Sequence, residues 1–352
     1  MAPSREHRSA NTWHRASVRP QVRRTAIIGA GGWGTALAAL WATDGRSISL
    51  WGNNPQRIDR VRTSRENPDY LPGVKLPSNV DATHEFADCG NADLVVFVTP
   101  SLAMRQVASR IRAAGIKENA VLLSCTKGIE HDTGLRMSQI LAEIFPSHTM
   151  AVLSGPNLAI EVARGLPTAT VIGCADERCA AGLQTFLGSE LFRIYTSSDV
   201  TSIELGGALK NVFAIAAGAS DGLDLGDNSK AALVTRSLAE LLRLGSAMGG
   251  NPRTFYGLSG AGDLIATCFS KHSRNRRVGE RLGRAETLAS IQADMQMVAE
   301  GVPTARSAFQ CARRLGIETP IIDQVHAVLY QGKPLRAAMQ DLLGRDPKSE
   351  RL

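Results

Sequence analysis

The sequence lacks the features that mark membrane-spanning, secreted and metal-binding proteins. It has no run of eighteen apolar residues and no apolar segment followed by a small-residue cleavage site, so we expect no membrane span and a cytoplasmic protein. Its six cysteines include no Cys-x-x-Cys pair and no histidine partner at a metal-ligand spacing. We therefore expect reduced thiols and no bound metal.

Excess positive charge is also missing from most of the chain. The formal net charge is +7, but residues 1–24 hold six arginines against one glutamate, which leaves only +2 for the rest. A nucleic-acid surface needs its positive charge on the folded domain, so we expect no nucleic-acid partner. Residues 1–24 are expected to be a disordered Arg-rich extension, with a transit peptide or a nucleic-acid arm as the alternatives.

Length and apolar patterning predict two domains. A chain of 352 residues with 43% hydrophobic residues exceeds what one core usually organises. In residues 25–199, short apolar runs alternate with helical patterns, which predicts an α/β domain with a Rossmann-like, mostly parallel sheet. The expected strands are 25–29, 47–51, 93–99, 121–125, 151–154, 168–172 and 192–195, and apolar spacing predicts a helix over 137–144.

Residues 200–345 carry a different pattern. Strand-like runs stop near Asp199, and Ala- and Leu-rich stretches such as 230–248 and 305–315 predict helices. We expect an all-helical C-terminal domain that holds the substrate. In two-domain enzymes the cleft between the domains is the usual place for chemistry, so we look there for candidate functional residues.

A glycine-rich turn follows the first expected strand. Residues 29–34 read Gly-Ala-Gly-Gly-Trp-Gly and lead into a helical pattern over 35–43. In this context the motif predicts a dinucleotide site: Gly29 allows the tight turn, Gly31 lets the backbone approach the pyrophosphate, and Gly34 lets the helix pack on the strand. The helix N-terminus offers free N–H groups to the phosphates.

The second expected strand ends without a carboxylate. It runs into Gly52, Asn53 and Asn54, whereas NAD-preferring sites normally place Asp or Glu there. A carboxylate would repel a 2′-phosphate, so its absence favours NADP, with NAD as the alternative or second cofactor. Asn53 could donate to either cofactor, and Arg57 could reach a phosphate.

Three further segments could supply a carbonyl-reducing site with a proton donor and cations. Lys127 follows an expected strand, at the edge where open α/β sheets bind ligands. Lys210 opens the helical half within an apolar stretch, where desolvation lowers a lysine pKa toward a useful value. Arg274 lies in Ser-Arg-Asn, whose guanidinium and short polar donors match phosphate oxygens.

With these segments in view, the sequence resembles the bacterial-type NAD(P)-dependent glycerol-3-phosphate dehydrogenases. The resemblance extends over about residues 25–344 and includes the glycine turn. Its other signatures are Thr126-Lys127-Gly128, Leu153-Ser154-Gly155-Pro156-Asn157, Leu205-Gly206-Gly207-Ala208-Leu209-Lys210-Asn211-Val212, Gly262-Asp263-Leu264 and Ser273-Arg274-Asn275-Arg276.

The resemblance implies hydride transfer between NAD(P)H and dihydroxyacetone phosphate, giving sn-glycerol 3-phosphate for glycerophospholipid synthesis. It implies that Lys210 is the general acid/base and that Asp263 and Lys127 orient it and the substrate. The substrate contacts would include these three residues and Gly155, Asn157, Ser273, Arg274 and Asn275. The cofactor contacts would be Gly32, Trp33, Asn53, Lys127, Ala159, Arg274, Val298 and Glu300, besides Gly29, Gly31 and Gly34 of the turn.

Two alternatives stay open at this point. One is another two-domain hydroxyacid dehydrogenase, because the Ser273-Arg274-Asn275 segment could bind a carboxylate. The other is a non-catalytic NAD(P)-binding redox regulator, because a fold alone does not guarantee an activity. The expected partner is a small-molecule substrate, and a homodimer is one option for the assembly.

Overall fold

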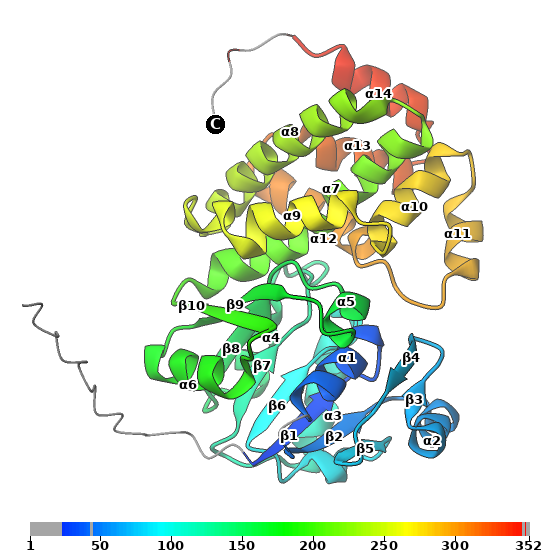
Figure 1. Cartoon of the computed structure of the whole chain (residues 1–352). Helices are drawn as coiled ribbons and strands as arrows, with labels where there is room; N and C mark the ends of the chain where they lie inside the picture. The colour runs from blue at the N-terminus through cyan, green and yellow to red at the C-terminus, as the bar shows by residue number, and fades with distance from the viewer. Residues whose placement is uncertain (1–22, 43–44, 347–348, 350–352) are drawn as a thin grey trace, which may run out of the picture.

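The computed structural model describes residues 23–42, 45–346 and 349 of the chain. The expected extension at residues 1–24 lies outside the described residues, except for its last two positions. The described part has an α/β half and a helical half, stacked one on the other (Figure 1). The expected fold class is confirmed.

An eight-stranded sheet forms the core of the first half. In order across the sheet, its strands are β10 (Phe192–Ser197), β9 (Thr168–Cys174), β8 (Met150–Ser154), β7 (Val121–Ser124), β6 (Leu94–Phe97), β1 (Arg24–Ile28), β2 (Ser47–Trp51) and β5 (Val80–Thr83). Neighbouring strands run parallel, except that β8 and β9 are antiparallel. All expected strands are present, with ends that differ by at most two residues.

Helices cover both faces of this sheet. They are α1 (Gly32–Trp41), α2 (Pro55–Ser64), α3 (Met104–Ala114), α4 (Met137–Ile144), α5 (Ala159–Ala163) and α6 (Glu177–Leu187). Side chains of β1 alternate between the faces, since Ile27 packs in one apolar cluster with Leu37 of α1 and Ile28 packs in another with Met104 of α3. The helix predicted over 137–144 is confirmed as α4.

The edge of the sheet beyond β2 was not predicted. Strand β5 at this edge, and the separate hairpin of β3 (Glu66–Asn67) with β4 (Leu71–Lys75), are short and lack the apolar runs from which strands are inferred. The hairpin lies beside α1 in Figure 1. It places Tyr70 and Leu71 on the wall of the central cavity.

The sheet order reverses between β1 and β6. The chain passes from β1 outward to β2 and β5, and then returns to add β6 on the other side of β1. At such a switch point the carboxyl ends of two neighbouring strands form a crevice in which open α/β sheets bind ligands. Gly29 follows β1 at this point, and Val98 and Thr99 follow β6.

The helical half begins with α7 (Val200–Gly222), and no strand follows β10 in the residues that the structure describes. The other helices are α8 (Gly226–Ala247), α9 (Asp263–Phe269), α10 (Arg274–Gly283), α11 (Leu288–Asp294), α12 (Gly301–Leu315), α13 (Pro320–Tyr330) and α14 (Leu335–Leu343), besides short turns at Thr254–Tyr256 and Leu258–Gly262. The division of the chain at residues 199 and 200 stays a prediction.

Helix α7 forms the core of the helical half. It is the one described helix long and apolar enough to cross a membrane by length and composition. However, 78% of its apolar 18-residue stretch is buried inside the protein. It packs against α8, α9, α10 and α12. Its backbone touches that of α10, since a Cβ on Gly218 would lie 1.8 Å from the Arg276 carbonyl oxygen. This contact, together with a hydrogen bond from Asn275 to Asn211, holds the start of α10 beside α7.

Candidate active site

A cavity of about 570 Å³ lies where the two halves meet. The sheet half contributes the glycine turn and the segments after β2, β6 and β7, and the helical half contributes residues of α7, α9 and α10. The cavity therefore opens at the switch point of the sheet and has the helical half as its opposite wall. Its size matches the sites that hold cofactors and small substrates.

The glycine turn has the geometry that its sequence predicted. Gly29 has φ +131°, and a Cβ there would lie 2.6 Å from the Val98 carbonyl oxygen. A Cβ on Gly34 would lie 1.9 Å from the Gly29 carbonyl oxygen, so this glycine lets α1 pack on β1. Gly31 has open space at its Cβ position and caps α1 without a side-chain hydrogen bond. The first turn of α1 thus fits a dinucleotide pyrophosphate.

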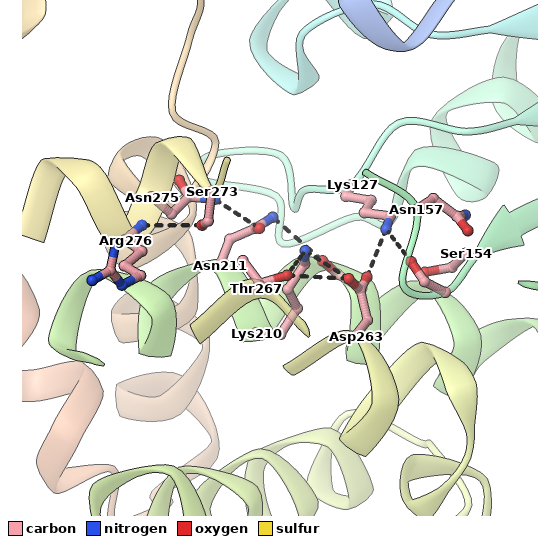
Figure 2. A network of polar contacts seen from close by, with 12 residues as sticks. Lys127, Ser154, Asn157, Lys210, Asn211, Asp263, Thr267, Ser273, Asn275 and Arg276 are labelled. Carbon is pink, nitrogen blue, oxygen red and sulfur yellow. Dashed lines mark hydrogen bonds and ion pairs between the residues drawn. The ribbon is translucent and has the colours of Figure 1, made fainter. Parts of the chain in front are cut away.

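A buried carboxylate of the helical half joins Lys127 of the sheet half to Lys210 of the helical half (Figure 2). Asp263, at the start of α9, accepts from Lys127 Nζ through Oδ2 at 2.6 Å and from Lys210 Nζ through Oδ1 at 2.9 Å. Lys127 also donates to the Gly155 carbonyl oxygen at 2.9 Å, and Lys210 donates to Thr267 Oγ1 at 2.6 Å. Lys127 and Lys210, which lie 136 and 53 positions before Asp263 in the sequence, therefore converge on one carboxylate.

Burial sets the protonation of this cluster. The Lys210 side chain is 8% exposed and that of Asp263 is 3% exposed. Burial lowers the pKa of Lys210 to about 8; Asp263 opposes this shift and Lys127 adds to it. Burial alone would raise the pKa of Asp263, but the two lysines outweigh it and keep that pKa below its usual value. Lys210 can therefore exchange a proton near neutral pH beside a permanent carboxylate.

The start of α10 forms a polar end to the cavity. Ser273 caps the helix through Oγ, which accepts from the Arg276 amide at 3.1 Å. Asn275 donates to Asn211 Oδ1 at 2.8 Å and accepts from the Gly301 amide at 2.8 Å, so its amide group is held in one orientation. Arg274 donates through Nη1 to the Val298 carbonyl oxygen at 2.8 Å. Short donors, a guanidinium and a helix N-terminus together suit a phosphate.

A second carboxylate links the two halves at the cavity. Glu300, just before α12, accepts from the Ser101 hydroxyl at 2.5 Å and from the Ser101 amide at 3.2 Å. Burial raises the pKa of Glu300, while the two Ser101 contacts and the charge of Arg274 oppose that shift. The contact joins the segment after β6 to the helical half across the cavity.

Known proteins resemble this chain over both halves. Residues 24–180 match the family model described as NAD-dependent glycerol-3-phosphate dehydrogenase N-terminus, and residues 199–340 match the model of its C-terminus. A glycerol-3-phosphate dehydrogenase [NAD(P)+] of Geobacter metallireducens is 46% identical over 329 residues, which cover 92% of this chain and 98% of the relative. One of Desulfitobacterium hafniense is 44% identical, with 93% of each chain covered.

The chain belongs to the NAD(P)-dependent glycerol-3-phosphate dehydrogenase family. A crystal structure of a family member, the glycerol-3-phosphate dehydrogenase of Coxiella burnetii, has a TM-score of 0.89 at 36% identity and covers 92% of this chain and 99% of its own. A ketopantoate reductase from Ralstonia eutropha has a TM-score of 0.59 at 16% identity, which shows a shared fold alone.

Most of the residues that the family resemblance singled out come together in this cavity. Those on its lining are Gly29, Gly31, Gly32, Trp33, Asn53, Lys127, Asn157, Ala159, Lys210, Asp263, Ser273, Arg274, Asn275, Val298 and Glu300. Gly34 and Gly155 are not among the lining residues. Gly34 is buried between α1 and β1, and Gly155 contributes its carbonyl oxygen to Lys127. The structure shows these two glycines supporting neighbouring groups, and their expected contacts with cofactor and substrate stay predictions.

Sequence reasoning assigned no role to three residues that contact side chains of this cavity. Thr267 contacts both Lys210 and Asp263, and Asn211 orients Asn275. Thr267 lies four positions after Asp263 on α9, a spacing that puts both on one helix face and could have revealed it. Ser101 had no such signal, because its partner Glu300 is 199 positions away.

Proposed function

We propose that this chain catalyses the reversible reduction of dihydroxyacetone phosphate to sn-glycerol 3-phosphate with NAD(P)H. The observation that carries the proposal is that Lys210, Arg274 and the glycine turn line one cavity. A proton donor, a phosphate-binding end and a dinucleotide-type turn therefore share one space. The 43–46% identity to relatives named glycerol-3-phosphate dehydrogenase [NAD(P)+] supports the same substrate.

Lys210 is the general acid/base in this proposal. The nicotinamide cofactor, when bound, supplies the hydride for C2 of the substrate or accepts it in the reverse direction. As an ammonium, Lys210 protonates the alkoxide oxygen that develops on C2 when the carbonyl is reduced. In the reverse direction the neutral amine removes the proton from the C2 hydroxyl. Asp263 holds the lysine through Oδ1 at 2.9 Å, and Thr267 fixes it from a second side at 2.6 Å.

The rest of the site positions the substrate. Ser273, Arg274 and Asn275 hold the phosphate end. Lys127 contributes a positive charge near the carbonyl end, and Asn157 contributes a neutral amide there. Asp263 carries one negative charge between two lysines, so the cluster keeps a net positive charge that favours a developing alkoxide. Burial of these groups strengthens that attraction because it excludes water.

The experiment that tests this function is steady-state kinetics with purified enzyme, dihydroxyacetone phosphate and either NADPH or NADH. We expect oxidation of reduced cofactor that depends on this substrate, with formation of sn-glycerol 3-phosphate. A panel of 2-oxoacids tests the hydroxyacid dehydrogenase alternative, since loss of well-placed substrate contacts lowers rates by orders of magnitude. Cofactor binding without turnover of any carbonyl substrate would favour the regulator alternative.

The proposal extends to the setting of the reaction. In a cytoplasmic enzyme of this activity, the product supplies the glycerol backbone of glycerophospholipids.

A homodimer is the assembly that we propose. Sedimentation velocity at micromolar concentration tests it, and a single species with the mass of one 37.6 kDa chain would contradict it.

A further inference from the structure

The cavity wall that follows β2 contains no carboxylate. It is formed by Trp51, Gly52, Asn53, Asn54, Arg57 and Ile58. In dinucleotide sites this position faces the adenosine ribose, where Asp or Glu binds the 2′-hydroxyl of NAD and an arginine accommodates the 2′-phosphate of NADP. The charged residue on this wall is thus a cation.

The Arg57 guanidinium is fixed in place before any ligand binds. Asn54 caps α2 and accepts from the Arg57 amide at 2.8 Å, which sets the backbone. Arg57 Nε donates to Asp69 Oδ2 at 2.8 Å, and its Nη1 donates to the Tyr70 hydroxyl. The guanidinium carbon also lies 4.5 Å from the centre of the Tyr70 ring. An arginine held on several sides loses little side-chain entropy when it binds a phosphate.

Charge at this wall stays positive despite Asp69. That carboxylate also accepts from Arg60 Nη2 at 2.6 Å, so two guanidinium groups share one negative charge. Asp69 is not among the residues that line the cavity. It therefore lies behind Arg57 and orients it, whereas the Arg57 side chain, 31% exposed, remains accessible to a ligand.

We infer that Arg57 determines cofactor specificity by binding the 2′-phosphate of NADP, and that Asp69 is the residue that positions it. This inference rests on the proposed function and deepens it, because it selects one cofactor for the same site. It predicts that the enzyme uses NADPH with a higher kcat/KM than NADH.

Nucleotide binding tests the inference without any turnover. Isothermal titration calorimetry compares 2′,5′-ADP with 5′-AMP, which differ in the 2′-phosphate alone. Arg57→Ala should weaken 2′,5′-ADP binding about 10- to 100-fold, the usual range for a lost charge-assisted contact, and leave 5′-AMP binding within about twofold. Arg60→Ala is the matched control, since Arg60 pairs with the same Asp69 but does not line the cavity; it should change neither affinity more than about twofold at physiological salt.

The positioning role of Asp69 has its own readout. Asp69→Asn keeps an acceptor but loses the charge that holds Arg57, so the ratio of the two nucleotide affinities should fall about two- to fivefold. A residue needed only for folding would weaken both nucleotides alike and leave the ratio unchanged. An unchanged ratio in Asp69→Asn would overturn the positioning role.

Kinetics with both cofactors separates this inference from the proposed function. Arg57→Ala should lower kcat/KM for NADPH about 10- to 100-fold and that for NADH less than about twofold. Equal losses with both cofactors, or none, would overturn the inference while leaving the activity intact. If the nucleotides bind as expected but dihydroxyacetone phosphate is not reduced, the proposed function fails and the role of Arg57 stands.

Discussion

Lys210 Nζ of α7 lies 2.9 Å from Oδ1 of Asp263 in α9, and the other carboxylate oxygen, Oδ2, accepts from Lys127 Nζ of the sheet half at 2.6 Å. Asp263 thus does two things at once: it stabilises a lysine whose burial lowers its pKa, and it ties the two halves of the molecule together at the cleft. Removing it would leave two cations facing each other in a poorly hydrated space.

The side chain of Lys210 is expected to dominate turnover. Lys210→Ala removes the proposed general acid, and such groups contribute about 10²- to 10⁴-fold, so kcat should fall by that factor. Lys230→Ala is the matched control, since Lys230 is also buried and paired with a carboxylate, Asp221 at 2.8 Å, but does not line the cavity. Near-normal kcat in Lys210→Ala would rule out the assigned role.

The pH dependence should differ between the two directions. Because the pKa of Lys210 lies near 8, the ammonium needed for ketone reduction is lost as pH rises through that value. The neutral amine needed for alcohol oxidation appears over the same range. We expect kcat/KM for reduction to fall above about pH 8 and that for oxidation to rise, measured between pH 6 and 10. Parallel pH profiles in the two directions would contradict this assignment.

Asp263→Asn should shift that profile and lower the rate. The charge of Asp263 raises the pKa of Lys210, against the effects of burial and of Lys127. Without this charge the lysine should lose its proton at a lower pH. The pH at which the rate of ketone reduction declines should therefore be lower, and kcat should fall at neutral pH. If Asp263 had a purely structural role, the variant would yield less folded enzyme, but the pH at which half of the reduction rate is lost would stay unchanged.

Two glycines of the turn should behave differently. Gly34→Ala places a Cβ 1.9 Å from the Gly29 carbonyl oxygen, so we expect a loss of about 1–3 kcal/mol in the free energy of unfolding. Gly31→Ala meets open space and should cost less than about 1 kcal/mol while weakening cofactor binding. Urea denaturation and fluorescence titration with NADPH measure the two effects. Equal stability of the two variants would contradict the packing argument.

Glu240 should make stability depend on pH. Its carboxylate is buried in α8 and accepts from the amides of Ile321 and Ile322, at 2.9 and 2.8 Å, at the start of α13. Burial raises its pKa to about 7, although these two amides oppose the shift. Because the folded state holds the proton more tightly, this contribution to stability is complete below about pH 4.5 and is lost as pH rises through about 7.

Glu240→Gln removes that titration. Relative to this variant, the wild type should lose stability between about pH 4.5 and 7, and urea denaturation at several pH values measures the difference. A constant difference across this range would show that Glu240 does not titrate there.

The sequence by itself determined seven of the eight strands of the sheet, the helical half and the dinucleotide turn, because these depend on local patterns. Alternating apolar runs give strands, 3.6-residue spacing gave α4 over Met137–Ile144, and Gly29 precedes a helix as the turn requires. Lys127, Lys210 and Arg274 also stood out locally, the first after a strand, the second in an apolar stretch and the third in a Ser-Arg-Asn segment. The roles of the remaining site residues came from the family resemblance.

Only the tertiary structure decided which of these residues meet. The contacts of Asp263 with Lys127, of Glu300 with Ser101 and of Asn275 with Asn211 span 136, 199 and 64 positions, and no local pattern encodes such pairs. The shift of the Lys210 pKa is likewise a product of packing, since it comes from burial and from neighbouring charges. Short segments such as β5 form strands because a neighbouring strand, here β2, offers its backbone hydrogen-bonding partners. The intrinsic strand propensity of the segment does not include this stabilisation.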